Sequence, residues 1–280
     1  MRPTFLWGDV DFAGIRRYSL GKRRDQSPSG QAALDESRTL AVAGDQEGAQ
    51  KKYLESKAQF KQAVLLCQAL QPEKFSSLKD ASLYAETMET TGEYDLAARG
   101  YEHAHRLDPT TPKLALLAGR NWRRVGEKYH DRALSLLLPI VKDEHANDAT
   151  LHAETFTELG RLYQVQGLYT LASDSYASAL SAETAPIEAR IGNALMQIRQ
   201  GQVVEPAKTL LSMTTLSPEQ AKFMQEALPK ALTALDSSRT AIPETAEAHF
   251  AYAQLLIRVQ RLFESFLAVE HAVLLDDSDF

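Results

Sequence analysis

Seven histidines and a single cysteine are the residues of this chain best suited to metal binding or nucleophilic chemistry. His103 and His105 are two positions apart, so on a helix their side chains point in different directions. His249 and His271 fall on different predicted helices. The sequence contains no HExxH motif, Walker loop, GxGxxG or GxSxG elbow. It therefore predicts a protein that is not an enzyme, with no catalytic residues, no cofactor and no metal.

Arginine is the second residue type whose spacing suggests chemistry, because a guanidinium group binds carboxylates through paired, charge-assisted hydrogen bonds. Arginines recur near the ends of several predicted helices, and apolar side chains share their faces. The set is Arg120, Arg123, Arg124, Arg161, Arg199 and Arg258, with Ile191, Leu195 and Phe250. It predicts a groove for an extended or helical peptide that carries acidic and apolar residues. The alternative is that these arginines complement helix dipoles, at about 0.3–1 kcal/mol each.

The elements that must position these residues are clearest in residues 153–184. Two amphipathic helical patterns meet there at Gly167. Gly160, Ala172 and Ala179 are small and stand where two helices must touch. The large residues on the same faces are Phe156, Leu159, Tyr163, Tyr169 and Tyr176. One helical hairpin cannot bury these faces alone, so the pattern predicts one unit of a stack.

The same pattern occurs at two other places in the chain. Gly167 and Tyr176 align with Gly92 and Tyr101 earlier in the sequence, and Gly126 marks a further copy between them. The interval from Gly92 to Gly126 gives a helix–turn–helix period of about 34 residues, the length typical of the tetratricopeptide repeat (TPR) family. With this order of small and aromatic residues, and with Asp108-Pro109 at the end of one unit, the chain resembles that family.

The resemblance implies an all-α fold, a solenoid of about five helical hairpins. It also implies a scaffold or adaptor that binds a peptide or protein subunit in a concave groove lined by the first helix of each hairpin. Some members grip a terminal carboxylate with a clamp of lysine and asparagine. The matching positions here carry Ser82, Glu86, Leu116 and Arg120, so that clamp is not expected.

The domain organisation predicted is an irregular N-terminal extension over residues 1–30 and a repeat array over 31–280. The extension contains an aromatic segment, Phe5-Leu6-Trp7, that is expected to dock on the array or on a partner. The repeat period breaks around residues 216–240, where Ser217-Pro218-Glu219-Gln220 has the pattern of a capping box. An inserted helix is predicted there, with a kink near Pro229.

The final predicted helix, residues 262–275, is apolar on nearly all sides, whereas an exposed helix needs only an apolar stripe. An uncovered end of this kind predicts self-association into a homo-oligomer or a contact with a partner helix. The residues proposed for this end are Phe263, Phe266, Leu267, Val273 and Leu274. The alternatives are a face less open than the sequence suggests, or a truncated chain.

The totals exclude several classes of protein. A net charge of −6 argues against a general nucleic-acid binder, and no apolar run is long enough to span a membrane. The lone Cys67 cannot form an internal disulfide, and no secretory signal is evident, so a cytoplasmic protein is predicted. Two other functions stay open: a dedicated chaperone for a secreted or self-assembling subunit, and a regulatory subunit that uses the inserted helix as its effector surface.

Overall fold

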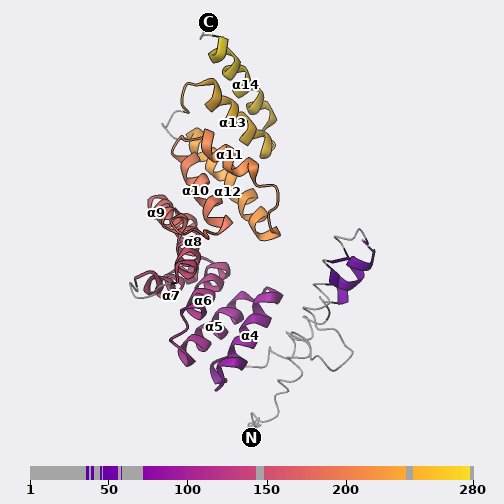
Figure 1. Cartoon of the computed structure of the whole chain (residues 1–280), viewed down its shortest axis with the longest axis vertical. Helices are drawn as coiled ribbons and strands as arrows, with labels where there is room; N and C mark the ends of the chain where they lie inside the picture. The colour runs from indigo at the N-terminus through magenta and orange to yellow at the C-terminus, as the bar shows by residue number, and fades with distance from the viewer. Residues whose placement is uncertain are drawn as a thin grey trace. The chain divides into compact units, whose positions relative to one another are not determined.

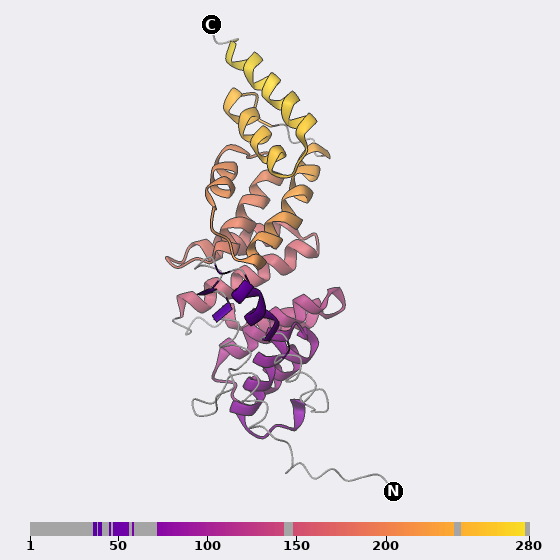
Figure 2. The same cartoon turned by 90° about the vertical axis from the view of Figure 1, so that its right-hand side faces the viewer.

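The computed structural model describes residues 72–142, 148–237 and 242–277, with residues 36–37, 39–40, 45, 47–55 and 58. These residues form helices and turns without a strand, which confirms the predicted all-α helical-hairpin fold (Figures 1 and 2). The predicted extension over 1–30, its docking through Phe5-Leu6-Trp7, and the environment of Cys67 lie outside the described residues. The chain divides into two compact units, Met1–Leu138 and Pro139–Phe280.

In the first unit, α4 and α5 form a hairpin, and α6 packs against α5. The elements are η2 (Pro72–Lys74), α4 (Leu78–Thr91), α5 (Tyr94–Leu107), α6 (Pro112–Val125), η3 (Glu127–Tyr129) and α7 (His130–Lys142). The boundary between the units falls within α7. Helix α6 packs closely on α7. A Cβ atom added at Gly119 of α6 would lie only 2.8 Å from the Leu137 side chain of α7.

The second unit contains three hairpins, α8–α9, α10–α11 and α13–α14, and one additional helix, α12. Helix α10 packs against α9, α13 packs against α11, and α12 packs against α10. The bounds are α8 (Ala149–Val165), α9 (Tyr169–Leu180), α10 (Ile187–Arg199), α11 (Val204–Ser212), α12 (Pro218–Ser237), α13 (Ala246–Arg258) and α14 (Leu262–Asp277).

Helix α12 occupies the region where the sequence predicts an extra helix, and it starts with a capping box. The Ser217 hydroxyl accepts a hydrogen bond from the Gln220 amide at 3.3 Å, and the Gln220 side chain accepts one from the Ser217 amide at 2.9 Å. The helix continues through Pro229, which lacks the amide hydrogen that would complete a helical hydrogen bond.

Small and bulky residues interlock in the way that the sequence predicts. Tyr176 of α9 is fully buried. A Cβ atom added at Gly192 of α10 would lie 2.2 Å from its ring, and one added at Gly160 of α8 would lie 2.7 Å from it. Both distances are far below van der Waals contact. Glycine at these two positions therefore lets one tyrosine ring pack against helices on both sides of α9.

The hairpins at α4–α5 and α8–α9 also repeat a polar contact. The Tyr101 hydroxyl hydrogen-bonds to a carboxylate oxygen of Glu89 at 3.0 Å, and the Tyr176 hydroxyl hydrogen-bonds to the Gln164 side chain at 2.8 Å. The two pairs occupy the same positions of the sequence repeat. Each bond ties the second helix of a hairpin to the first. The sequence repeat is therefore a structural repeat at the level of individual side-chain contacts.

Four of the hairpin turns close in the same way, with a backbone amide donating to the carbonyl five residues earlier at 2.9–3.0 Å. The pairs are Glu93 to Met88, Leu168 to Tyr163, Gln202 to Gln197 and Arg261 to Leu256. This is the hydrogen bond of a Schellman motif, which needs a left-handed residue just before the donor. That residue is glycine at positions 92, 167 and 201, but Gln260 in the last turn, with φ +63°.

Replacing Gln260 with glycine is expected to stabilise the chain by about 0.5–1 kcal/mol, because the left-handed conformation penalises a residue with a Cβ atom more than it penalises glycine. Chemical denaturation monitored by circular dichroism measures the change. Gln260→Ala is the matched control, since it shortens the side chain and keeps the Cβ atom. A glycine variant no more stable than the alanine variant would contradict the interpretation.

Candidate interaction surface

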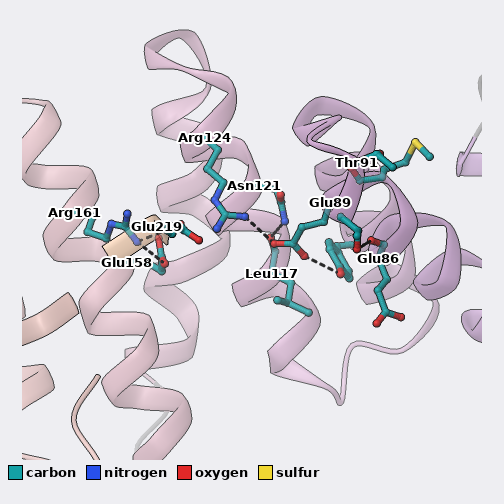
Figure 3. Close-up of polar contacts among 12 residues, drawn as sticks. Glu86, Glu89, Thr91, Leu117, Asn121, Arg124, Glu158, Arg161 and Glu219 are labelled. Carbon is teal, nitrogen blue, oxygen red and sulfur yellow. Dashed lines mark hydrogen bonds and ion pairs between the residues drawn. The ribbon is translucent and has the colours of Figure 1, made fainter. Parts of the chain in front are cut away.

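Arg124 of α6 is used inside the first unit. Its guanidinium donates a hydrogen bond to Glu89 of α4 (Figure 3), over a distance of 2.8 Å. It also lies over the Tyr94 ring of α5, 5.1 Å from the centroid. The Arg124 and Glu89 side chains are both largely shielded from solvent. Since Glu89 also accepts the Tyr101 hydrogen bond, one carboxylate connects α4, α5 and α6. The expectation that Arg124 is available to a ligand therefore needs correction.

Arg120 and Arg123 are half-buried in the same helix, and their charges act on neighbours within the unit. Burial raises the pKa of Tyr101, and the nearby Glu89 carboxylate raises it further. The positive charge of Arg120 opposes both effects. Burial lowers the pKa of His130, and the Arg123 charge lowers it further. Binding of a partner by Arg120 and Arg123 remains a prediction.

Arg161 of α8 is 8% exposed, so it too is used internally. Its Nη1 atom lies 3.8 Å from a carboxylate oxygen of Glu158 and 3.8 Å from one of Glu219. Figure 3 shows the Arg161 side chain pointing toward both carboxylates. The guanidinium also lies over the Phe223 ring, 4.7 Å from the centroid. Glu219 and Phe223 both belong to α12. The inserted helix therefore supplies the carboxylate and the apolar contact that the sequence assigns to a foreign peptide.

Ile191 and Leu195 of α10 are completely buried, so the expectation that they line an open wall is wrong for this structure. The reason is α12, whose Met224 and Leu228 belong to the same apolar cluster. The side-chain amide of Gln220, also in α12, donates to Glu188 of α10 at 3.1 Å. The sequence predicts a helix at this position but contains no direct indication of the surface on which it docks.

Arg199, at the end of α10, stacks on an aromatic ring within its own unit. Its guanidinium carbon lies 3.6 Å from the centroid of the Tyr169 ring of α9. One of its nitrogens also approaches the backbone carbonyl of Lys230 in α12, at 3.5 Å. Among the predicted arginines of the second unit, Arg161 and Arg199 thus hold helices of that unit together.

Helix α13 keeps its predicted inner-face residues exposed. Phe250 is 52% exposed, and Ile257, seven residues later on the same face, is exposed to a similar degree. Arg258 is exposed beside them. Within the described part of the chain it has no hydrogen-bond or ion-pair partner. Of the predicted groove, this stretch of α13 is therefore the part in which apolar and basic side chains are both accessible.

Helix α14 exposes a larger apolar surface. Phe263 is 75% exposed and Phe266 66%, and three more large residues of the predicted association end are exposed with them: Leu267, Val273 and Leu274. Of the sixteen large apolar side chains that are exposed in the described residues, eight belong to α13 and α14. Isolated exposed apolar residues are ordinary on protein surfaces, whereas such a concentration is typical of interaction sites.

Sequence reasoning missed one cluster, which lies in the same hairpin. His271 of α14 places its Nε2 atom 3.1 Å from a carboxylate oxygen of Glu244, and His249 of α13 places its Nε2 atom 3.9 Å from the same oxygen. The two imidazole rings are 4.3 Å apart, nearly edge to face. Burial lowers the pKa of His249, the neighbouring His271 lowers it further, and Glu244 opposes both.

A signal for this pairing is present in the sequence. His249 and His271 are equally far along the chain from Gln260, at the turn of the α13–α14 hairpin. In two antiparallel helices, residues equally distant from the turn come to lie side by side. The sequence prediction noted only that these histidines belong to different helices, and did not use their equal distance from the turn.

Comparisons with known proteins add little about function. No family model matches the chain, and no curated protein matches it. Among solved structures, the chain is similar to one described as the crystal structure of MamA protein, with 17% sequence identity and a TM-score of 0.40 over 71% of this chain and 92% of that chain. A likeness this distant carries no inference about a partner. In the described residues, no helix combines the length and apolar character needed to cross a membrane.

Proposed function

We propose that this protein is a non-catalytic scaffold that binds another protein, and that a helix of the partner docks on the apolar face of α14. This α14 face consists of Phe263, Phe266, Leu267, Val273 and Leu274. The observation that carries the proposal is the exposure of these five side chains, which are as large and apolar as those buried between helices elsewhere in the fold. Removing them from water is favourable, at about 1.5–3 kcal/mol for each fully buried side chain.

The spacing of the α14 face suits a helix as the occupant. From Phe263 to Leu274 the face extends about 16 Å along the helix axis, with residues three and four apart as in helix–helix contacts. The equivalent helices α5 and α9 are covered by the next helix of the array, α6 and α10 respectively. In α5, Ala98 is fully buried, whereas the matching position of α14 is Phe266. A docked helix on α14 would thus repeat a contact that the fold already makes.

The charges of α14 favour a basic partner helix over a second copy of this chain. The helix contains Glu264, Glu270, Asp276 and Asp277, and it contains no lysine or arginine. Pairing two α14 helices would bring these acidic side chains close to one another, which is unfavourable. A helix with apolar residues on one side and arginine or lysine at the edges complements both the face and its charge.

The chain itself provides a suitable probe. A labelled peptide of residues 112–126 copies α6, which covers α5, and it contains one lysine and three arginines. We expect saturable binding of this peptide to the full chain by fluorescence anisotropy. Phe263→Asp combined with Phe266→Asp should weaken binding at least about tenfold, because the double change removes apolar contact area and replaces it with two carboxylates whose removal from water is unfavourable.

Val165→Asp is the matched control, since Val165 is an exposed apolar residue of α8. This variant should bind the peptide like the wild type, and circular dichroism should show that all the variants stay helical. Equal binding by the Phe263/Phe266 variant and the wild type would exclude the α14 face. A rise in mass of the chain alone, abolished by the same variant in light scattering, would instead favour a homo-oligomer.

A further inference from the structure

Three potential metal ligands meet at one end of the last hairpin. Glu244 lies in the segment before α13, His249 is in the first turns of α13, and His271 is in the second half of α14. One ligand atom from each lies within 4.8 Å of the other two. We propose that Glu244, His249 and His271 bind a divalent transition-metal ion, with Zn²⁺ as the cation that fits the site best.

The distances are close to those that a metal ion requires. Zinc binds imidazole nitrogen at about 2.0–2.1 Å and carboxylate oxygen at about 2.0–2.2 Å, so tetrahedral ligand atoms lie roughly 3.3–3.5 Å apart. The Glu244 oxygen is 3.1 Å from Nε2 of His271 and 3.9 Å from Nε2 of His249. Shifts below about 1 Å bring both pairs into this range. Glu244 and His271 are exposed side chains, so they can adjust without repacking the helices.

The surroundings of the His249 Nε2 atom also favour a bound cation. Its Nε2 atom is shielded from solvent, and no hydrogen-bond partner is present for it among the described residues. Buried polar atoms without a partner are uncommon and require an explanation. The atom faces the carboxylate of Glu244 from 3.9 Å, too far for a hydrogen bond. A cation between the two would satisfy both groups.

Hydrogen bonds hold the backbone around Glu244 in place, so the cluster is part of the ordered fold. The Thr245 side chain caps α13 by accepting a hydrogen bond from the Ala248 amide at 3.2 Å. The His249 amide donates to the Thr245 carbonyl at 3.1 Å. These bonds fix the position of Glu244 relative to His249, while the hairpin fixes His249 relative to His271. The backbone of all three ligand residues is therefore in place before a metal binds, and the exposed side chains of Glu244 and His271 need only small adjustments.

The donor set selects among metals. Two imidazoles and one carboxylate suit zinc, nickel and copper, whereas calcium and magnesium prefer oxygen ligands alone. Three protein ligands leave a fourth position for water or for a side chain of a partner. A bound ion would also join the segment before α13 to α14, and so stabilise the last hairpin.

The test uses the full chain, stripped of metal by chelation and then titrated with ZnCl₂ in a calorimeter. We expect one zinc ion per chain and a higher melting temperature of the zinc-loaded protein. His271→Ala should weaken zinc binding at least about tenfold, and so should His249→Ala. Cobalt(II) should give the visible absorption of a tetrahedral complex, and that absorption should be lost in His271→Ala. Excess Mg²⁺ should not compete.

His105→Ala is the control, because His105 lies in α5, in the other unit. It should bind zinc like the wild type. Because His271 is exposed, its replacement tests the site even if His249→Ala fails to fold. Zinc binding that is absent from the wild type, or that survives in His271→Ala unchanged, would overturn the proposal. In that case Glu244 and His271 form only the hydrogen bond seen at 3.1 Å.

Discussion

Tyr176→Ala is expected to lower the free energy of unfolding of the second unit by about 3–5 kcal/mol, as for other large aromatic side chains in well-packed cores. Tyr176 is fully buried, and its ring packs against Gly160 and Gly192 on two different helices. Glycine has no side chain that can move into the space, so the variant keeps most of the cavity. A cavity that cannot collapse lowers the free energy of unfolding by the larger values of this range. Urea denaturation followed by circular dichroism measures the loss.

Tyr176→Phe separates the ring from its hydroxyl group. This variant keeps the packing against both glycines and removes the 2.8 Å hydrogen bond to Gln164. It should therefore be less stable than the wild type by about 0.5–1.5 kcal/mol. If alanine proved no more destabilising than phenylalanine, the ring would not be the element that holds α8, α9 and α10 together.

The interlocking around Tyr176 is also the part of the fold that sequence reasoning predicts best. Each hairpin is a local structure, and the contact between neighbouring hairpins follows from the repeat. The positions of Gly160 and Tyr176 therefore determine both their own hairpin and the surface offered to the next one. This is why the repeat period, read from residue types alone, predicts the positions of the hairpin helices and of their glycine turns.

The arginines show where such reasoning stops. The repeat predicts that Arg124 and Arg161 each lie on the first helix of a hairpin, and they lie on α6 and α8. It does not predict what faces them, because Glu89 and Glu219 lie far away in sequence. A charge pattern gives only the residues that are available for pairing, and the partner comes from tertiary packing. An inserted helix such as α12 breaks the repeat, so its docking surface cannot be derived from the other hairpins.

The internal role of these arginines predicts a second large loss of stability. Arg124→Glu is expected to destabilise the first unit by about 2–3 kcal/mol, because it removes one partner of a shielded ion pair. The change eliminates the 2.8 Å contact with Glu89 and places a second carboxylate in its position. Losing one partner of a fully buried pair costs about 3–5 kcal/mol, and the smaller value here reflects the partial exposure of both side chains. Thermal and urea denaturation measure the change.

Arg258→Glu is the matched control, because Arg258 is exposed on α13 and has no partner within the described residues. Its reversal should change stability by no more than about 0.5 kcal/mol. The double variant Glu89→Arg with Arg124→Glu should recover part of the loss, because opposite charges face each other again while the Tyr101 hydrogen bond and the contact with the Tyr94 ring are not rebuilt. An Arg124→Glu variant as stable as Arg258→Glu would show that the fold does not depend on Arg124, and would restore it as a candidate for binding a partner.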